Sequence, residues 1–170
     1  MRLLDLCCGS GGWTKGFMDE GFDCTGVDIQ DIKKYPGKLI VSDIHDFRTS
    51  ERYDVVVASP ECRGFGPARI WSQAGYLAQH QELDMIWRCF QIVSEIKPKY
   101  WIIENAKYIK DFIGGYKHVV YNPGYNSCRK QWVLYGEFPI PGMFHESVTW
   151  DGYSISSKDP RRAEIPYPMA

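Results

Sequence analysis

The chain has 170 residues, a formal net charge of −1 and 44% hydrophobic residues. This length favours one domain, and this hydrophobic content is sufficient for a buried core. The near-neutral charge excludes a strong overall attraction to nucleic acid, so any such contact depends on local patches. No apolar run approaches the roughly 18 residues of a membrane span, and Asp5 interrupts the apolar start that a signal peptide would need.

The six cysteines include no C-x-x-C pair, which is the spacing typical of zinc sites. We therefore expect no metal site. The simplest prediction is a cytoplasmic or nucleoid-associated protein, not secreted, whose thiols stay reduced.

The first segment predicts a nucleotide-binding turn. Residues 2–7 predict a strand, C-G-S-G-G follows at residues 8–12, and apolar residues then recur at helical spacing up to residue 21. A strand, a glycine turn and a helix let a nucleoside approach the backbone closely. The pattern is G-x-G-G and differs from the dinucleotide pattern G-x-G-x-x-G.

Two acidic residues follow at strand ends. Residues 24–29 predict a second strand that contains Asp28, and residues 39–42 predict a third that ends before Asp43 and Ile44. An acidic residue about 20 residues after a glycine turn is where a ribose diol is bound, so Asp28 favours a nucleoside cofactor. Asp43 could accept from an adenine amino group while Ile44 packs on the ring. The alternative is that Asp43 is a cap or turn aspartate.

The three valines at residues 55–57 predict a strand that is buried on both faces. It ends at Ser59-Pro60 because proline cannot continue a strand ladder. Cys62 follows at the edge where ligands gather in open α/β sheets, so it is a candidate nucleophile. The alternative is an ordinary small apolar residue in a loop. Gly64 and Gly66 are expected to loosen the chain just after this cysteine.

Residues 68–80 show no clear periodicity and are expected to form a mobile lid. An apolar stripe then predicts an amphipathic helix over roughly residues 79–96. The residues of that stripe are Leu83, Ile86, Trp87, Phe90 and Val93.

Residues 100–105 predict another buried strand, which brings Glu104 and Asn105 to the same edge as Cys62. Core strands rarely bury a carboxylate that has no partner or task. Residues 118–121 and 131–136 predict an antiparallel hairpin at one sheet edge. Residues 138–170 contain many turn signals and predict an irregular wrap, so we expect one domain over residues 1–170 with its core in 1–137.

These segments, in this order, resemble the DNA (cytosine-5) methyltransferases. Three of the matching blocks are D-L-C-C-G-S-G-G-W at residues 5–13, S-P-E-C-R-G-F at 59–65 and P-K-Y-W-I-I-E-N-A at 98–106. The others are Asp28 with Asp43-Ile44, and S-C-R-K-Q-W-V-L-Y-G at 127–136. The resemblance implies an α/β, Rossmann-like S-adenosylmethionine-dependent methyltransferase fold. Its sheet would be mostly parallel and doubly wound, with an antiparallel edge hairpin.

The resemblance also implies a mechanism and a site. Cys62 would attack carbon 6 of a cytosine in DNA, and carbon 5 would then take a methyl group from S-adenosylmethionine. Glu104 would bind N3 and the amino group of the base, Asn105 would hold Glu104 or the loop backbone, and Arg129 would place the substrate. The residues implied for cofactor binding are Asp5, Cys7, Cys8, Gly9, Ser10, Gly11, Gly12, Trp13, Asp28, Ile29, Asp43, Ile44 and Pro60.

The sequence departs from the family pattern at three points. Glu61 stands where the family usually has proline, and it disfavours a thiolate at Cys62 unless Arg63 or Arg129 offsets its charge. Of the family's Q-x-R-x-R hairpin block only Arg129 carries over. The separate recognition domain that follows this block is missing, so a protein partner or a further C-terminal segment would supply target recognition. The alternatives are the same chemistry on RNA, and a non-catalytic cofactor-binding subunit or relic.

Overall fold

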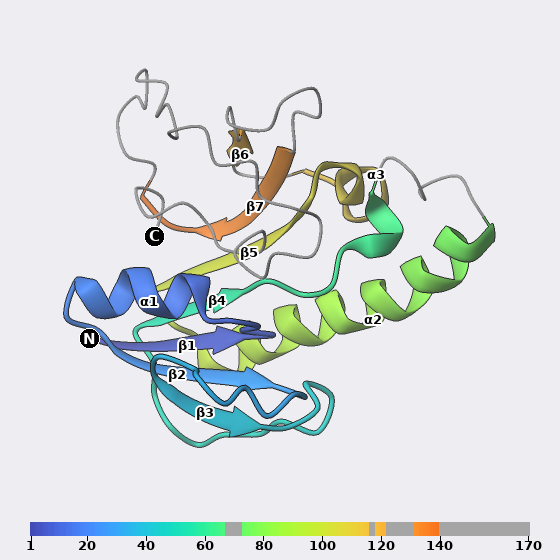
Figure 1. The fold of residues 1–170 in the computed structure, drawn as a ribbon. Helices are drawn as coiled ribbons and strands as arrows, with labels where there is room; N and C mark the ends of the chain where they lie inside the picture. The colour runs from blue at the N-terminus through green and yellow to red at the C-terminus, as the bar shows by residue number, and fades with distance from the viewer. Residues whose placement is uncertain (67–72, 116–117, 122–130, 140–170) are drawn as a thin grey trace, which may run out of the picture.

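The computed structural model describes residues 1–66, 73–115, 118–121 and 131–139. They form a seven-stranded sheet with the order β3-β2-β1-β4-β5-β7-β6 (Figure 1). The strands are β1 (Arg2–Leu6), β2 (Asp23–Asp28), β3 (Lys38–Val41), β4 (Val55–Ala58), β5 (Tyr100–Ala106), β6 (His118–Tyr121) and β7 (Gln131–Glu137). The helices are α1 (Gly12–Asp19), α2 (Gln73–Ile96) and α3 (Lys110–Ile113), with short 3-10 turns η1 (Arg63–Phe65) and η2 (Lys107–Ile109).

The topology creates one switch point in the sheet. The chain runs from β1 outward through β2 to β3, and then returns to place β4 on the other side of β1. These strands and β5 are parallel, whereas β7 pairs antiparallel with both β5 and β6. The predicted antiparallel pair at a sheet edge is therefore confirmed. Ligands of open α/β sheets bind where the strand order reverses, which here is beside the carboxyl ends of β1 and β4.

Alternating side chains give the sheet two apolar faces. On one face, Leu3 of β1 and Val55 of β4 pack with Trp13 of α1. On the other face, Leu4 of β1 packs in a larger cluster with Ile86 of α2. Helices therefore cover both faces, as the ribbon shows (Figure 1). The predicted doubly wound arrangement is confirmed.

The helix α2 is longer than predicted. It begins at Gln73, so part of the predicted lid is helical, while residues 67–72 lie outside the described residues. The first turns contain good helix formers such as glutamine, alanine and leucine. Tyr76 and Leu77 are 60% and 65% exposed, which explains why no apolar period marks the start of this helix.

The predicted apolar stripe of α2 is partly wrong. Trp87 is 51% exposed, whereas Gln79 and Glu82 are buried together with Ile86 and Cys89. Two polar residues on the buried face hide the true period from a hydrophobicity pattern.

The remaining differences from the prediction concern short elements and segments outside the described residues. The turns η1 and η2 and the short helix α3 were not predicted. The connection at residues 122–130 and the predicted wrap from residue 140 onward lie outside the described residues, so the single-domain boundaries stay a prediction. No helix within the described part of the chain is long and apolar enough to cross a membrane.

Candidate active site

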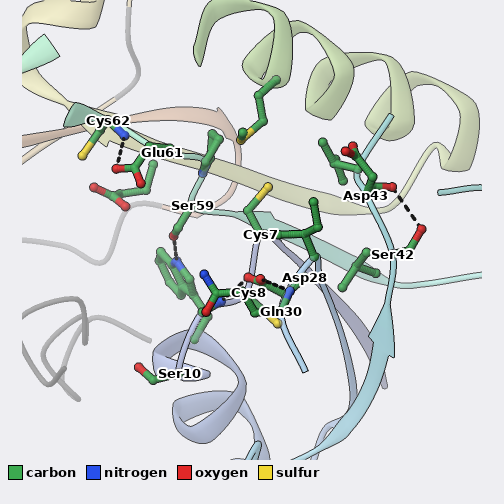
Figure 2. A pocket seen from close by; sticks show the side chains of 18 of the residues that line it. Cys7, Cys8, Ser10, Asp28, Gln30, Ser42, Asp43, Ser59, Glu61 and Cys62 are labelled. Atoms are coloured by element: carbon green, nitrogen blue, oxygen red, sulfur yellow. Dashed lines mark hydrogen bonds between the residues drawn. The ribbon is translucent and has the colours of Figure 1, made fainter. Parts of the chain in front are cut away.

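A cavity of about 600 Å³ opens at the carboxyl ends of the parallel strands, beside the switch point (Figure 2). Two loops border it, which we name the glycine loop (residues 7–12) and the cysteine loop (residues 59–66). Its volume lies within the range of small-molecule sites. Most of the predicted site residues line it, namely Cys7, Cys8, Gly9, Ser10, Gly12, Trp13, Asp28, Ile29, Asp43, Ile44, Pro60, Cys62 and Glu104.

The glycine loop turns tightly between β1 and α1. Gly9 has φ +49° and Gly11 has φ +84°, both in the left-handed region that favours glycine. An added Cβ at Gly9 would meet nothing within 4 Å, so this residue leaves open space. At Gly11 a Cβ would lie 2.8 Å from Cδ of Pro36. One glycine thus opens the turn and the other allows a neighbouring loop to pack beneath it.

Asp28 ties the glycine loop to the end of β2. Its Oδ2 accepts from the backbone N–H of Gly9 at 2.9 Å, and its Oδ1 accepts from that of Gln30 at 2.9 Å. A carboxylate has about four acceptor positions, so these two bonds leave capacity for further donors. Asp28 therefore combines a structural task with a place on the cavity wall (Figure 2).

Asp43 begins a tight turn and also lines the cavity. Its Oδ1 accepts from the backbone N–H of His45 at 2.8 Å, so the turn alternative is confirmed. Arg88 of α2 is buried and donates to the carbonyl oxygens of Ile44 at 3.4 Å and Phe47 at 3.0 Å. The helix α2 thus fixes the turn that carries Asp43 and Ile44.

The cysteine loop is anchored near its start by two side chains. Nε1 of Trp13 donates to Oγ of Ser59 at 3.0 Å. Nδ2 of Asn105 donates to the carbonyl oxygen of Pro60 at 3.2 Å. Asn105 does not line the cavity, and its predicted contact with the loop backbone is confirmed.

Glu61 faces the cavity beside Cys62 (Figure 2). Its Oε1 accepts from the backbone N–H of Cys62 at 3.1 Å, and its Oε2 lies 3.0 Å from Nε of Arg63. Arg63 therefore supplies the positive charge that was expected to offset this carboxylate. Arg129, the other candidate cation, lies outside the described residues.

Glu104 on β5 reaches the same cavity as Cys62 and is 9% exposed. The sheet brings it there because β5 lies next to β4, with Ala58 and Ile103 in register. The predicted convergence of these two side chains at one edge is therefore observed.

Cys7 and Cys8 of the glycine loop lie in surroundings that disfavour the reactive thiolate form. A hydrogen bond with Cys89 and burial raise the pKa of Cys7 well above its ordinary value. Burial, with the charge of Asp5 nearby, raises the pKa of Cys8 to about 12. Both groups therefore stay protonated at neutral pH, and a protonated thiol is a poor nucleophile.

Asp5 lies beneath the glycine loop and does not line the cavity. It is 1% exposed, and its Oδ2 accepts from Oγ1 of Thr14 at 2.9 Å and from the hydroxyl of Tyr35 at 3.3 Å. Burial raises the pKa of Asp5 to about 7. Gly11 is also absent from the cavity wall, so these two predicted cofactor residues do not line the site.

Several residues of the cavity wall were not predicted. Gln81, Asp84 and Met85 come from α2, and Trp132 comes from β7. The spacing of the first three puts them on one helix side, which is the only sequence signal for them. Among the described residues, no cluster of three metal-binding side chains is found.

Comparison with known sequences identifies relatives of one kind. The sequence pattern of the family described as C-5 cytosine-specific DNA methylase matches residues 1–120. The Type II methyltransferase M.FnuDI of Fusobacterium nucleatum is 28% identical over 142 residues, which are 72% of this chain and 40% of that protein. The "Probable DNA (cytosine-5)-methyltransferase" of Frog virus 3 is 30% identical over 132 residues, or 71% of this chain and 61% of that one.

Solved structures share the fold. The "putative DNA modification methyltransferase" of an E. coli prophage aligns with a TM-score of 0.55 and 16% identity, over 80% of this chain and 46% of that one. The tRNA (uracil-54, C5)-methyltransferase of Pyrococcus abyssi, solved with S-adenosyl-L-homocysteine, aligns with a TM-score of 0.50 and 13% identity, over 79% and 33%. The fold is that of S-adenosylmethionine-dependent methyltransferases. This chain spans less than two thirds of the length of each of these proteins.

Proposed function

Because this chain belongs to the C-5 cytosine-specific DNA methylases, we propose that it transfers a methyl group from S-adenosylmethionine to carbon 5 of cytosine in DNA through a covalent cysteine adduct. The observation that carries this proposal is that Cys62 and Glu104 line the same cavity as the glycine loop and Asp28. A nucleophile, a carboxyl group for the base and a nucleoside site are thereby combined in one space.

The residues of the cavity fit the proposed cofactor. Gly9 leaves space without a side chain, Asp28 presents carboxylate oxygens suited to ribose hydroxyls, and Ile44 offers an apolar surface for a purine ring. When bound, S-adenosylmethionine supplies a methyl group on a positively charged sulfur.

Cytosine is a poor nucleophile at carbon 5, which is why a covalent route is needed. The thiolate of Cys62 adds to carbon 6, and this new C–S bond turns the ring into an enamine that is nucleophilic at carbon 5. Glu104 bonds to N3 and the amino group, where charge develops in the ring. After methylation, carbon 5 loses its proton to a base, the C–S bond breaks and the thiolate is restored.

The cysteine in this reaction must reach a base that is normally stacked inside a duplex. Flipping the base out costs a few kcal/mol and exposes carbon 6 to attack. Because Cys62 lies in a loop that borders an open cavity, the extruded base would enter from the side of the cysteine loop.

Covalent trapping tests the proposal. In 5-fluorocytosine the carbon 5 hydrogen is replaced by fluorine, so no proton can leave and the adduct with Cys62 persists. We expect a denaturation-resistant protein–DNA adduct that requires S-adenosylmethionine and is lost in Cys62→Ala. Methylation without an adduct would overturn the covalent route, and an adduct formed on RNA but not on DNA would move the substrate to RNA. A protein that binds the cofactor but forms neither product would be a non-catalytic member of the family.

The choice of a target sequence needs contacts with the bases that flank the methylated cytosine. Discrimination needs several side chains at base edges, each good pair contributing roughly 1–3 kcal/mol. The net charge of −1 also argues against strong non-specific binding. We propose that this chain alone methylates weakly and in a short context, or depends on a protein partner or a further segment for its target. Bisulfite sequencing of treated random-sequence DNA tests this, and a sharp site of four or more base pairs would contradict it.

A further inference from the structure

The far end of the cysteine loop is held by two buried side chains of α2. The backbone N–H of Gly64 lies 3.0 Å from Oε1 and 2.9 Å from Oε2 of Glu82. Nε2 of Gln79 donates to the carbonyl oxygen of Gly64 at 2.9 Å. Glu82 and Gln79 are 4% and 5% exposed. Both backbone polar groups of one glycine are therefore bonded by side chains that lie 15 and 18 residues further along the chain.

This contact requires glycine at position 64. An added Cβ would lie 2.9 Å from the backbone nitrogen of Gln79 and 2.9 Å from Oε2 of Glu82. The nitrogen belongs to the helix and cannot yield unless α2 or the loop moves. The expectation that Gly64 loosens the loop is therefore wrong, because this glycine brings the loop close enough to be bonded.

The bonded glycine stands two residues after Cys62. One residue beyond Gly64, the backbone N–H of Phe65 donates to the carbonyl oxygen of Cys62 at 3.2 Å, which closes the 3-10 turn η1. Phe65 itself is fully buried. On the other side of Cys62, the carbonyl of Pro60 is bonded by Asn105. Cys62 thus lies midway between two anchored backbone positions.

We propose that Glu82 and Gln79 are positioning residues that fix the thiol of Cys62 at the cavity through the backbone of Gly64. This inference rests on the proposed function, in which Cys62 is the nucleophile. A misplacement of about 1 Å in a reacting group costs on the order of 100-fold in rate, so small shifts of this loop matter.

The charge on Glu82 supports this role. Burial is the main cause that raises the pKa of Glu82 to about 6; the Gly64 N–H opposes this shift, and the charge of Glu61 adds to it. The positive charge of Arg63 also opposes the rise of this pKa. At neutral pH Glu82 is therefore mostly a carboxylate, and hydrogen bonds from N–H groups to a carboxylate are stronger than those to a neutral acceptor.

Four variants test the inference. Glu82→Leu removes the acceptor of the Gly64 N–H, and Gly64→Ala adds a Cβ that forces the loop away from α2. Glu82→Gln keeps an oxygen that can accept from the Gly64 N–H. Ile92→Ala is the control, because Ile92 is a 2% exposed core residue of the same helix that lies far along it from the loop. For each we would measure kcat, cofactor Kd, melting temperature and the rate at which iodoacetamide alkylates Cys62, followed by peptide mass spectrometry.

We expect Glu82→Leu and Gly64→Ala to lower kcat about 10- to 100-fold and to change the alkylation rate of Cys62, with cofactor Kd within about twofold of wild type. Glu82→Gln should stay within about fivefold of wild type in kcat. Ile92→Ala should lower the melting temperature and leave kcat and the alkylation rate unchanged at a temperature where it is folded.

The inference would be overturned if kcat and the alkylation rate of Cys62 were unchanged in Gly64→Ala or Glu82→Leu. It would also be overturned if Ile92→Ala lost as much kcat as a Glu82→Leu protein of the same melting temperature. If Glu82→Leu does not fold, Gly64→Ala decides. A wild-type protein that methylates no cytosine would defeat the proposed function alone, because the alkylation rate of Cys62 still reports whether α2 positions the loop.

Discussion

The two loops that border the cavity are held in different ways. The glycine loop is fixed within itself and to one adjacent strand. The Gly11 N–H donates to the carbonyl oxygen of Cys8 at 2.9 Å, the Cys8 N–H donates to that of Val27 on β2 at 3.1 Å, and Asp28 of β2 accepts from the Gly9 N–H. The cysteine loop is fixed by side chains from three separate elements, α1, β5 and α2. The first loop therefore depends on its own sequence and one adjacent strand, whereas the second depends on side chains from three elements that pack around it.

The largest expected effect separates the two loops by function. Cys62→Ala should lower methyl transfer by about 10³-fold or more, because the covalent step has no substitute nucleophile. Cofactor affinity should stay within about twofold, since the thiol belongs to the base side of the cavity. Radiolabelled methyl transfer and isothermal titration measure the two quantities. A large loss of cofactor affinity would show that the loops are not functionally separate.

A second effect probes the carboxyl group beneath the glycine loop. The folded-state pKa of Asp5 is about 7, above its ordinary value of 3.8, so the folded protein holds this proton more tightly than the unfolded chain. The stability that comes from this proton is complete below about pH 4 and is lost as the pH rises through about 7. The loss should be on the order of a few kcal/mol.

The side chain of Asp5→Asn cannot ionise, so this variant should lack the loss of stability with rising pH that Asp5 causes. Urea unfolding of wild type and Asp5→Asn at several pH values between about 4 and 8 measures the difference. Parallel curves for the two proteins would mean that the buried carboxyl does not titrate in this range.

A third effect concerns the link between the glycine loop and β2. Asp28→Ala removes the acceptor for Gly9 and Gln30 and the proposed partner of the ribose. We expect a loss of about 1.5–3 kcal/mol in cofactor binding, which is roughly 10- to 150-fold in Kd. Asp31→Ala is the matched control, because Asp31 is exposed, pairs with Lys33 and does not line the cavity. Equal affinities of the two variants would reduce Asp28 to a structural residue.

The smallest effect concerns the cysteine loop itself. Glu61→Pro restores the usual family residue and removes the bonds of Glu61 to Cys62 N–H and Arg63. Because Asn105, Gln79 and Glu82 still anchor the loop, we expect kcat within about threefold of wild type, which is less than about 1 kcal/mol. A folded but inactive Glu61→Pro protein would instead show that this carboxylate acts on the base. Steady-state methyl transfer with a melting curve distinguishes these results.

Local features of this site were predictable from the sequence. The strand, glycine turn and helix of residues 2–21 follow from a short pattern, and so does the end of β4 at Ala58, just before Ser59-Pro60. The convergence of Cys62 and Glu104 follows from one rule, that parallel strands bring their carboxyl ends to one edge. The antiparallel pair of β6 and β7 was also predictable, from the turn signal Pro123-Gly124 in the sequence between them.

The remainder depends on contacts that no local pattern records. Gln79 and Glu82 lie in a stretch without apolar period, because their buried atoms bond to a loop instead of packing in a core. Tyr35 reaches Asp5 through the space left by Gly26, where an added Cβ would lie 2.2 Å from the tyrosine hydroxyl. Predicting this contact requires knowing which loop crosses which strand, and residue spacing alone does not give that information.

The bond between Trp13 and Ser59 has a consequence for protein engineering. It joins the first helix to the start of the cysteine loop across two adjacent strands, at 3.0 Å. A chimera that takes residues 5–13 from a relative would therefore alter the support of a segment that lies 46 positions further along the chain. Exchanges between members of this family should move positions 13 and 59 as a pair, and libraries that randomise one should sample the other with it.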